Sequence, residues 1–227
     1  MTWFEQHKHR VLVSILCCAF LLESTTHGLL AARIFISVIF FAVLFVVFEH
    51  RHHRIVAIIL AIAGVASGWA HYSLPKGDLD VPLGVTHYLL ATVFFGYSTV
   101  VILGNIFRKG AVSADDVLGA VCGYLVAGAA WSNLYALIYT LVPDAFALSS
   151  VFSAQASDWP GRTSAFNYFS IVTLTTMGYG DITPVRAPAT GFAMLEAVFG
   201  QFYIAIVVAQ LVGARMSPQA PQNSADV

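Results

Sequence analysis

The stretch that most constrains this chain is Thr175-Thr176-Met177-Gly178-Tyr179-Gly180-Asp181, in which two glycines flank one aromatic residue. It lies between two long apolar segments, residues 112–142 and 188–212. The amphipathic run that leads into it, residues 164–174, is short. At about 1.5 Å per residue, a helix of that length crosses only about half of a bilayer. Irregular backbone at membrane depth is tolerated only inside protein or beside a water-filled path, so the sequence predicts a re-entrant loop and a pore.

The composition places the chain in a membrane. Of the 227 residues, 58% are hydrophobic and only 10% are charged, whereas soluble domains carry about 25% charged residues. The net charge of −1 gives no reason to expect a nucleic-acid partner. The three cysteines all lie inside apolar runs and are interpreted as packing residues. The sequence contains no nucleophile–base set, metal-ligand cluster or phosphate-binding loop, so we expect no enzyme and no organic cofactor.

The residue types of the central stretch favour a cation as its ligand. Glycine reaches backbone conformations that other residues avoid, so Gly178 and Gly180, alternating with Met177 and Tyr179, can turn successive carbonyls to the same side. Several chains around one axis would then stack rings of carbonyl oxygens, which can replace the water shell of a dehydrated cation. The simpler alternative is a glycine-rich turn between two helices, which leaves the paired threonines, the half-length helix and the acid unexplained.

The run Thr-Thr-Met-Gly-Tyr-Gly-Asp closely resembles the selectivity filter of tetrameric potassium channels. The resemblance implies that K⁺ is the permeant ion and that its ligands are the carbonyls of Thr176, Met177, Gly178 and Tyr179. The Thr176 hydroxyl would form the innermost ring. The common form of the motif has Val, Ile or Leu where this chain has Met177. An apolar side chain that points away from the ion is compatible with that position, because only main-chain oxygens face the ion.

The resemblance covers a whole pore module over residues 113–213, with an outer helix, an extracellular turret, the pore helix, the filter and an inner helix. Four such modules form one pore in this family. Since this chain contains one module, the resemblance implies a homotetramer.

The expected fold is an all-α membrane protein with six transmembrane helices, a re-entrant pore helix and a filter loop. The spanning helices are predicted at about residues 11–26, 29–48, 55–72, 83–107, 114–141 and 188–214, and the pore helix at about 164–174. We divide the chain into a four-helix N-terminal transmembrane domain (1–110), a pore domain (111–215) and a disordered cytoplasmic tail (216–227). This tail is too short for a soluble ligand-binding domain.

Basic residues predict the orientation in the plasma membrane. With both termini in the cytoplasm, seven of them fall on the inner side: Lys8, Arg10, Arg51, Arg54, Arg108, Lys109 and Arg215. The filter loop then enters from outside. The negative end of the pore-helix dipole points at the membrane centre, where it favours a cation.

Further residues are assigned to filter support by their motif positions: Tyr168, Thr173, Thr175, Gly180, Asp181 and Glu196. Gly180 and Asp181 would form the outer mouth, and we predict that the Tyr168 hydroxyl reaches Asp181. The filter Tyr of the family bonds to the pore helix of a neighbouring subunit, and Thr173 is the better partner for Tyr179 here. Val172 stands where one bacterial subgroup has a Glu, so inactivation through a Glu–Asp pair is not expected.

The sixth helix contains candidates for gating. Gly200 lies twenty residues after Gly180 and matches the hinge glycine of the family, although a small residue for close helix packing is an equal alternative. Ile204, Val208 and Leu211 follow at helical spacing and would line the cavity and inner gate, unless they face lipid or another subunit.

Glu196 is an acid inside an apolar helix, and an intramembrane carboxyl suggests a function by default. We predict that it lies behind the filter and bonds to pore-helix hydroxyls such as Ser170 or Thr173. The alternative is a protonated acid with a purely structural role.

Four helices before a pore module resemble the layout of six-helix voltage-gated channels. The predicted fourth helix, however, contains no Arg or Lys before Arg108 at its inner end. We therefore expect no strong voltage dependence. His50, His52 and His53, with Arg51 and Arg54, are interpreted as a topogenic or headgroup-binding loop in preference to a proton or metal sensor.

The sequence thus predicts a potassium-selective channel that conducts passively as a homotetramer among membrane lipids. Two alternatives stay open. One is a weakly selective cation channel, and the other is a non-conducting membrane sensor or regulatory subunit with a pore-like fold.

Overall fold

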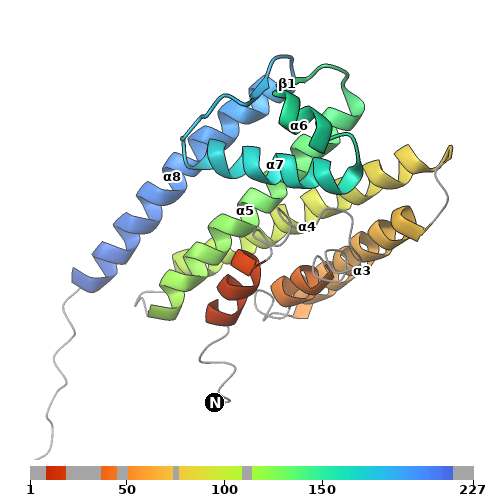
Figure 1. Cartoon of the computed structure of the whole chain (residues 1–227). Helices are drawn as coiled ribbons and strands as arrows, with labels where there is room; N and C mark the ends of the chain where they lie inside the picture. Colours follow the sequence, from red (N-terminus) through yellow and green to blue (C-terminus); the bar gives the residue numbers. More distant parts are fainter. Residues whose placement is uncertain (1–8, 19–36, 45–50, 74–76, 109–113, 217–227) are drawn as a thin grey trace, which may run out of the picture.

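A computed structural model of the protein describes residues 9–18, 37–44, 51–73, 77–108 and 114–216 (Figure 1). Residues 9–18 and 37–44 are helical. The elements that follow are α3 (Arg51–Ser73), α4 (Asp80–Arg108), α5 (Ala114–Leu141), β1 (Phe146–Leu148), α6 (Ser150–Gln155), α7 (Trp159–Leu174), β2 (Ile182–Pro184) and α8 (Ala189–Met216).

Four of the described helices are long and apolar enough to cross a membrane, at His53–His71, Asp80–Ile106, Asp116–Leu141 and Ala189–Gln210. They correspond to the predicted third, fourth, fifth and sixth spanning helices, so the chain is a mainly helical membrane protein. The predicted helices at 11–26 and 29–48 lie partly outside the described residues, and the count of six remains a prediction.

Three helices begin earlier than predicted, and one of them is α4, which starts at Asp80 and not at residue 83. α3 starts at Arg51, so residues 51–54 form its first turn and not the predicted loop. α7 starts at Trp159 and not at residue 164, because Asp158 caps it by accepting a hydrogen bond from the Gly161 amide at 2.7 Å. A proline in the first turn, where no amide donor is needed, also favours this start.

A small antiparallel sheet was not predicted and is the one addition to the all-α class among the described residues. β1 pairs with β2 in the register Phe146 to Pro184 and Leu148 to Ile182. The amide of Ser149 also donates to the Asp181 carbonyl at 2.9 Å. The sheet therefore joins the segment after α5 to the residues that directly follow the 175–181 segment.

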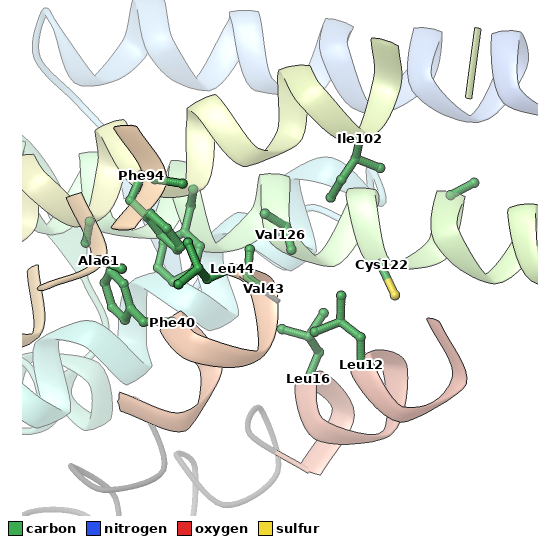
Figure 2. Close-up of a cluster of buried hydrophobic side chains, with 14 of the residues drawn as sticks. Leu12, Leu16, Phe40, Val43, Leu44, Ala61, Phe94, Ile102, Cys122 and Val126 are labelled. Atoms are coloured by element: carbon green, nitrogen blue, oxygen red, sulfur yellow. The ribbon is translucent and has the colours of Figure 1, made fainter. Parts of the chain in front are cut away.

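A core of buried apolar side chains joins the N-terminal helical segments to α3, α4, α5 and α8. Figure 2 shows Leu12 and Leu16 pointing toward Cys122 on α5, and Phe40 lying among side chains of the neighbouring helices. The Phe40 and Phe94 rings are stacked with centroids 4.8 Å apart. α4 packs along α5 of the same chain, so the N-terminal helices lie against α5.

Trp159, the first residue of α7, links this helix to α4. Its indole stacks on Tyr88 of α4 with centroids 5.2 Å apart, and its Nε1 donates to Asp80 Oδ2 at 3.3 Å. The ring also fills the space beside Gly84, where an added Cβ would lie 2.0 Å from an indole carbon. Only glycine leaves room for the indole at this position of α4.

Two glycines of α4 provide a matched test of this contact. Gly84→Ala should lower stability by about 1–3 kcal/mol, because the new methyl group must displace the buried face of Trp159. Gly96→Ala should be neutral or stabilising by up to about 1 kcal/mol, since nothing lies within 4 Å of its added Cβ. Thermal unfolding in detergent, followed by tryptophan fluorescence, measures both; equal midpoints for the two variants would contradict the packing described.

Candidate functional site

The 175–181 segment directly follows the last residue of α7. The helix has 16 residues, which corresponds to about 24 Å of length, less than the hydrocarbon core of a bilayer. Its last turn is continued by three backbone hydrogen bonds: Thr175 N to Ile171 O, Thr176 N to Thr173 O and Met177 N to Val172 O, each 3.0 Å. The chain then leaves the helix as an irregular run.

The backbone angle φ changes sign from one residue of this run to the next. Thr176, Gly178 and Gly180 have φ values of 58°, 57° and 81°, while Met177 and Tyr179 are not among the residues with positive φ. Alternating left- and right-handed residues is the pattern that lets successive carbonyls face one side. Thr176 is β-branched, and holding such a residue at positive φ costs on the order of 1–3 kcal/mol. Strain of that kind marks a conformation that the surroundings enforce.

The run is exposed in the single chain, although it belongs to a membrane protein. Residues 175–180 are all exposed, with Met177 at 57% and Tyr179 at 61%. Within the described part of the chain, no backbone hydrogen bond involves residues 178–180. Polar backbone at membrane depth must be satisfied by other protein, by water or by an ion.

Asp181 holds the end of the run that is farther along the chain from α7. The Tyr168 hydroxyl donates to Asp181 Oδ2 at 2.6 Å, which confirms the contact predicted from the sequence. The other carboxylate oxygen accepts from the Ile182 amide at 3.1 Å. The Tyr168 ring is in turn stacked between Phe152 of α6, at 4.9 Å, and Tyr179, at 6.4 Å.

At the end of the run that adjoins α7, threonine hydroxyls donate to carbonyls of that helix. Thr173 donates to the Phe169 carbonyl at 2.8 Å and Thr175 to the Ile171 carbonyl at 2.6 Å. The Tyr179 hydroxyl lies 3.8 Å from Met177 Sδ of its own chain. The predicted bond between Thr173 and Tyr179 joins two subunits, so it remains a prediction.

Glu196 of α8 is fully buried and holds three helices together behind the run. Its Oε1 accepts from the Ser170 hydroxyl of α7 at 2.5 Å, which confirms the predicted contact. Its Oε2 accepts from Tyr135 of α5 at 2.6 Å. The Tyr135 contact was missed, because one tyrosine in an apolar helix carries no sequence signal of its partner. The Ser170 hydroxyl also lies 3.0 Å from the Gly128 carbonyl of α5.

Gly200 lies where α8 meets the end of α7. A Cβ built on it would lie 2.4 Å from the Leu174 carbonyl oxygen, and α8 runs without interruption from Ala189 to Met216. This close approach favours the packing interpretation of Gly200, and the hinge role remains a prediction.

Ile204 and Val208 are about half exposed and border an apolar groove that α8 forms with Val117 and Val121 of α5. A pore-lining role for them is untested in a single chain. The side chain of Leu211 lies outside the described residues.

The histidines near the start of α3 are only partly described. His53 Nδ1 lies 2.5 Å from the Tyr97 hydroxyl of α4, while His50 and the side chain of His52 lie outside the described residues. Among the residues that the structure describes, no group of three or more His, Cys, Asp or Glu side chains is placed to hold a metal ion.

Residues 118–215 match a family model described as an ion channel. The match runs from α5 through α7 and the 175–181 segment to the end of α8, and it covers less than half of the 227-residue chain. No curated protein and no solved structure matches the chain at a significant level. The match supports an ion channel, which is not a class of enzyme.

The contacts of Glu196 lead to a stability prediction. Glu196→Leu should destabilise the protein by about 1–3 kcal/mol, because it removes the described acceptor of the buried Tyr135 hydroxyl, whereas Ser170 keeps the Gly128 carbonyl. Glu196→Gln should retain most of the stability, because an amide can accept from Tyr135 and donate to the Ser170 oxygen. Unfolding of the detergent-solubilised variants by heat measures both. A Leu variant as stable as the Gln variant would show that the two hydrogen bonds contribute nothing.

Proposed function

We propose that four copies of this chain form a potassium-selective channel, in which the 175–181 segments line one central pore as its filter. Conduction is passive and follows the electrochemical gradient. The proposal starts from the ion channel match and adds the ion, the assembly and the residues that hold the ion.

The observation that carries the proposal is the alternating backbone of the filter. Positive φ recurs at Thr176, Gly178 and Gly180, directly after a helix that is too short to span the membrane. Carbonyls that share one side, repeated around an axis, form stacked rings of oxygens. Such rings replace the hydration shell of a cation as it enters. The ligands are the carbonyls of the four residues from Thr176 to Tyr179, with the Thr176 hydroxyl as the innermost ring.

The exposure of the filter supports assembly. A single chain leaves Met177 and Tyr179 more than half exposed, and among the described residues the backbone of residues 178–180 makes no hydrogen bond to other backbone groups. Closed rotational symmetry satisfies both, since each copy covers its neighbour and the shared axis holds the ion. The number four comes from the resemblance of this segment to the filter of tetrameric potassium channels, each of which contains four such segments.

Contacts at both ends of the filter, and behind it, hold its backbone in place. Asp181, bonded to Tyr168, fixes the outer mouth next to Gly180, and the end of α7 fixes the inner end. The carboxyl-terminal end of the α7 dipole carries partial negative charge and favours a cation at the membrane centre. Glu196 fixes α7 against α5 and α8 from behind.

The seven basic residues that the sequence analysis assigns to one side favour a plasma-membrane protein with both termini in the cytoplasm. In this orientation the β1–β2 sheet and α6 lie on the outer side.

Flux through liposomes tests the proposal directly. Protein reconstituted into K⁺-loaded vesicles should release K⁺ down its gradient and should give a reversal potential that follows K⁺ and not Na⁺. Gly178→Ala should reduce the flux about tenfold or more, because a side chain at φ 57° costs about 1–2 kcal/mol in each subunit. Gly191→Ala is the matched control, since nothing lies within 4 Å of its added Cβ.

Each outcome of the flux assay has a defined meaning. A reversal potential that does not distinguish K⁺ from Na⁺ would replace the proposal with a weakly selective cation channel. Absence of flux from a folded wild-type tetramer would favour a non-conducting membrane sensor or regulatory subunit.

The composition of α4 leads to a prediction about gating. α4 contains no Arg or Lys between Asp80 and Phe107, and moving one elementary charge across 100 mV supplies about 2.3 kcal/mol. Channel opening should therefore change by less than about fiftyfold per 100 mV, which is the response to one full gating charge. Planar bilayer recordings over a range of voltages measure this; a steeper curve would contradict it.

A further inference from the structure

Gln201 follows Gly200 on α8 and has no counterpart among the residues predicted to form the filter or the gate. Its side chain is exposed in the single chain, and its Nε2 lies 3.4 Å from the Thr176 hydroxyl. This contact joins a residue of the inner helix to the innermost ring of the proposed filter.

Gly200 fixes the position of Gln201 along the proposed pore. Because Gly200 has no side chain, α8 comes so close to α7 that a Cβ would lie 2.4 Å from the Leu174 carbonyl oxygen. Leu174 is the last residue of α7. The residue after Gly200 is thereby held at the level of Thr176, where the filter begins.

Gln201 also shares a helix face with residues predicted to line the pore. Ile204, Val208 and Leu211 follow it at intervals of three, four and three residues, which keeps all four on one side of a helix. Gln201 is the polar member of this stripe. An amide in an apolar helix is costly unless it faces a polar partner or water, so its exposed position favours a water-filled path.

We propose that Gln201 is a positioning residue for the inner end of the filter, an inference that rests on the proposed function. Its Nε2 donates to the Thr176 hydroxyl and fixes the direction of that oxygen. Its Oε1 is then left to accept hydrogen bonds from the water shell of a cation that arrives from the cytoplasm. Four copies form a polar ring in which K⁺ exchanges water for the Thr176 ligands.

Substitution by an apolar residue tests the positioning role. Gln201→Leu should lower the preference for K⁺ over Na⁺ about two- to tenfold, the range expected for the loss of one modest hydrogen bond. The preference is read from reversal potentials of reconstituted channels under opposed K⁺ and Na⁺ gradients. Gln210→Leu is the matched control, because Gln210 lies about two and a half turns further along α8, on the opposite face. It should leave the preference unchanged.

Charged substitutions test whether the side chain faces the ion path. Gln201→Glu should raise the single-channel conductance at low cytoplasmic K⁺, and Gln201→Lys should lower it, since the two charges attract and repel the arriving cation. A purely structural role would give losses of the same sign in both. The same pair at Gln210 should change the conductance little.

Two results would overturn the inference while leaving the proposed function intact. One is a K⁺-selective wild-type channel whose selectivity is unchanged by Gln201→Leu. The other is a conductance that Gln201→Glu and Gln201→Lys shift in the same direction. If Gln201→Leu fails to assemble, as judged by size-exclusion chromatography, the charged pair decides alone. A wild-type protein that conducts no K⁺ would instead refute the proposed function.

Discussion

The arrangement of this chain depends on one constraint of the backbone. The run from Gly178 to Gly180 has no backbone hydrogen bonds within the described part of the chain, yet it belongs to a protein whose described helices are apolar enough to span a membrane. Unsatisfied peptide groups are too costly in hydrocarbon, so the surrounding structure must both hold the run and supply partners for it. The end of α7 holds one side of the run and Asp181 holds the other. The ions and neighbouring copies of the proposed channel would supply the missing partners.

The polar contacts around the run form a frame that links elements distant in sequence. Glu196 joins α5, α7 and α8 through two hydroxyls, and the β1–β2 sheet joins the chain before α7 to the chain after the run. Trp159 extends this frame to α4. α4 therefore contacts the first turn of α7 directly, although it carries no Arg or Lys before Arg108.

The parts of the site that could be predicted are those written in local sequence. The spacing of Gly178 and Gly180 indicated an alternating backbone, and the positive φ values agree with it. The contact from Tyr168 to Asp181 was predicted from the motif positions of the family that the run resembles. The contact from Ser170 to Glu196 was predicted because an acid inside an apolar helix requires a donor.

Other features depend on tertiary contacts that leave little trace in the sequence. The strands β1 and β2 have three residues each, too few for a period-two pattern to show. The start of α7 was misplaced because the cap at Asp158 precedes any apolar repeat. The partner of Tyr135 and the neighbour of Gln201 follow from how α8 packs, which no local pattern encodes.

The contact between Gly200 and Leu174 has a mechanical consequence for α8. With no side chain between the helix and the end of α7, α8 is clamped at this level, and Glu196 secures it one turn above. Below the clamp, the Tyr203 hydroxyl reaches the Ala120 carbonyl at 2.7 Å. In the proposed channel, any movement of the cytoplasmic end of α8 would therefore be restrained at the level of Gly200. Gln201 lies next to this contact and beside Thr176, so a displacement at the far end of α8 would reach the proposed filter only as a much smaller displacement.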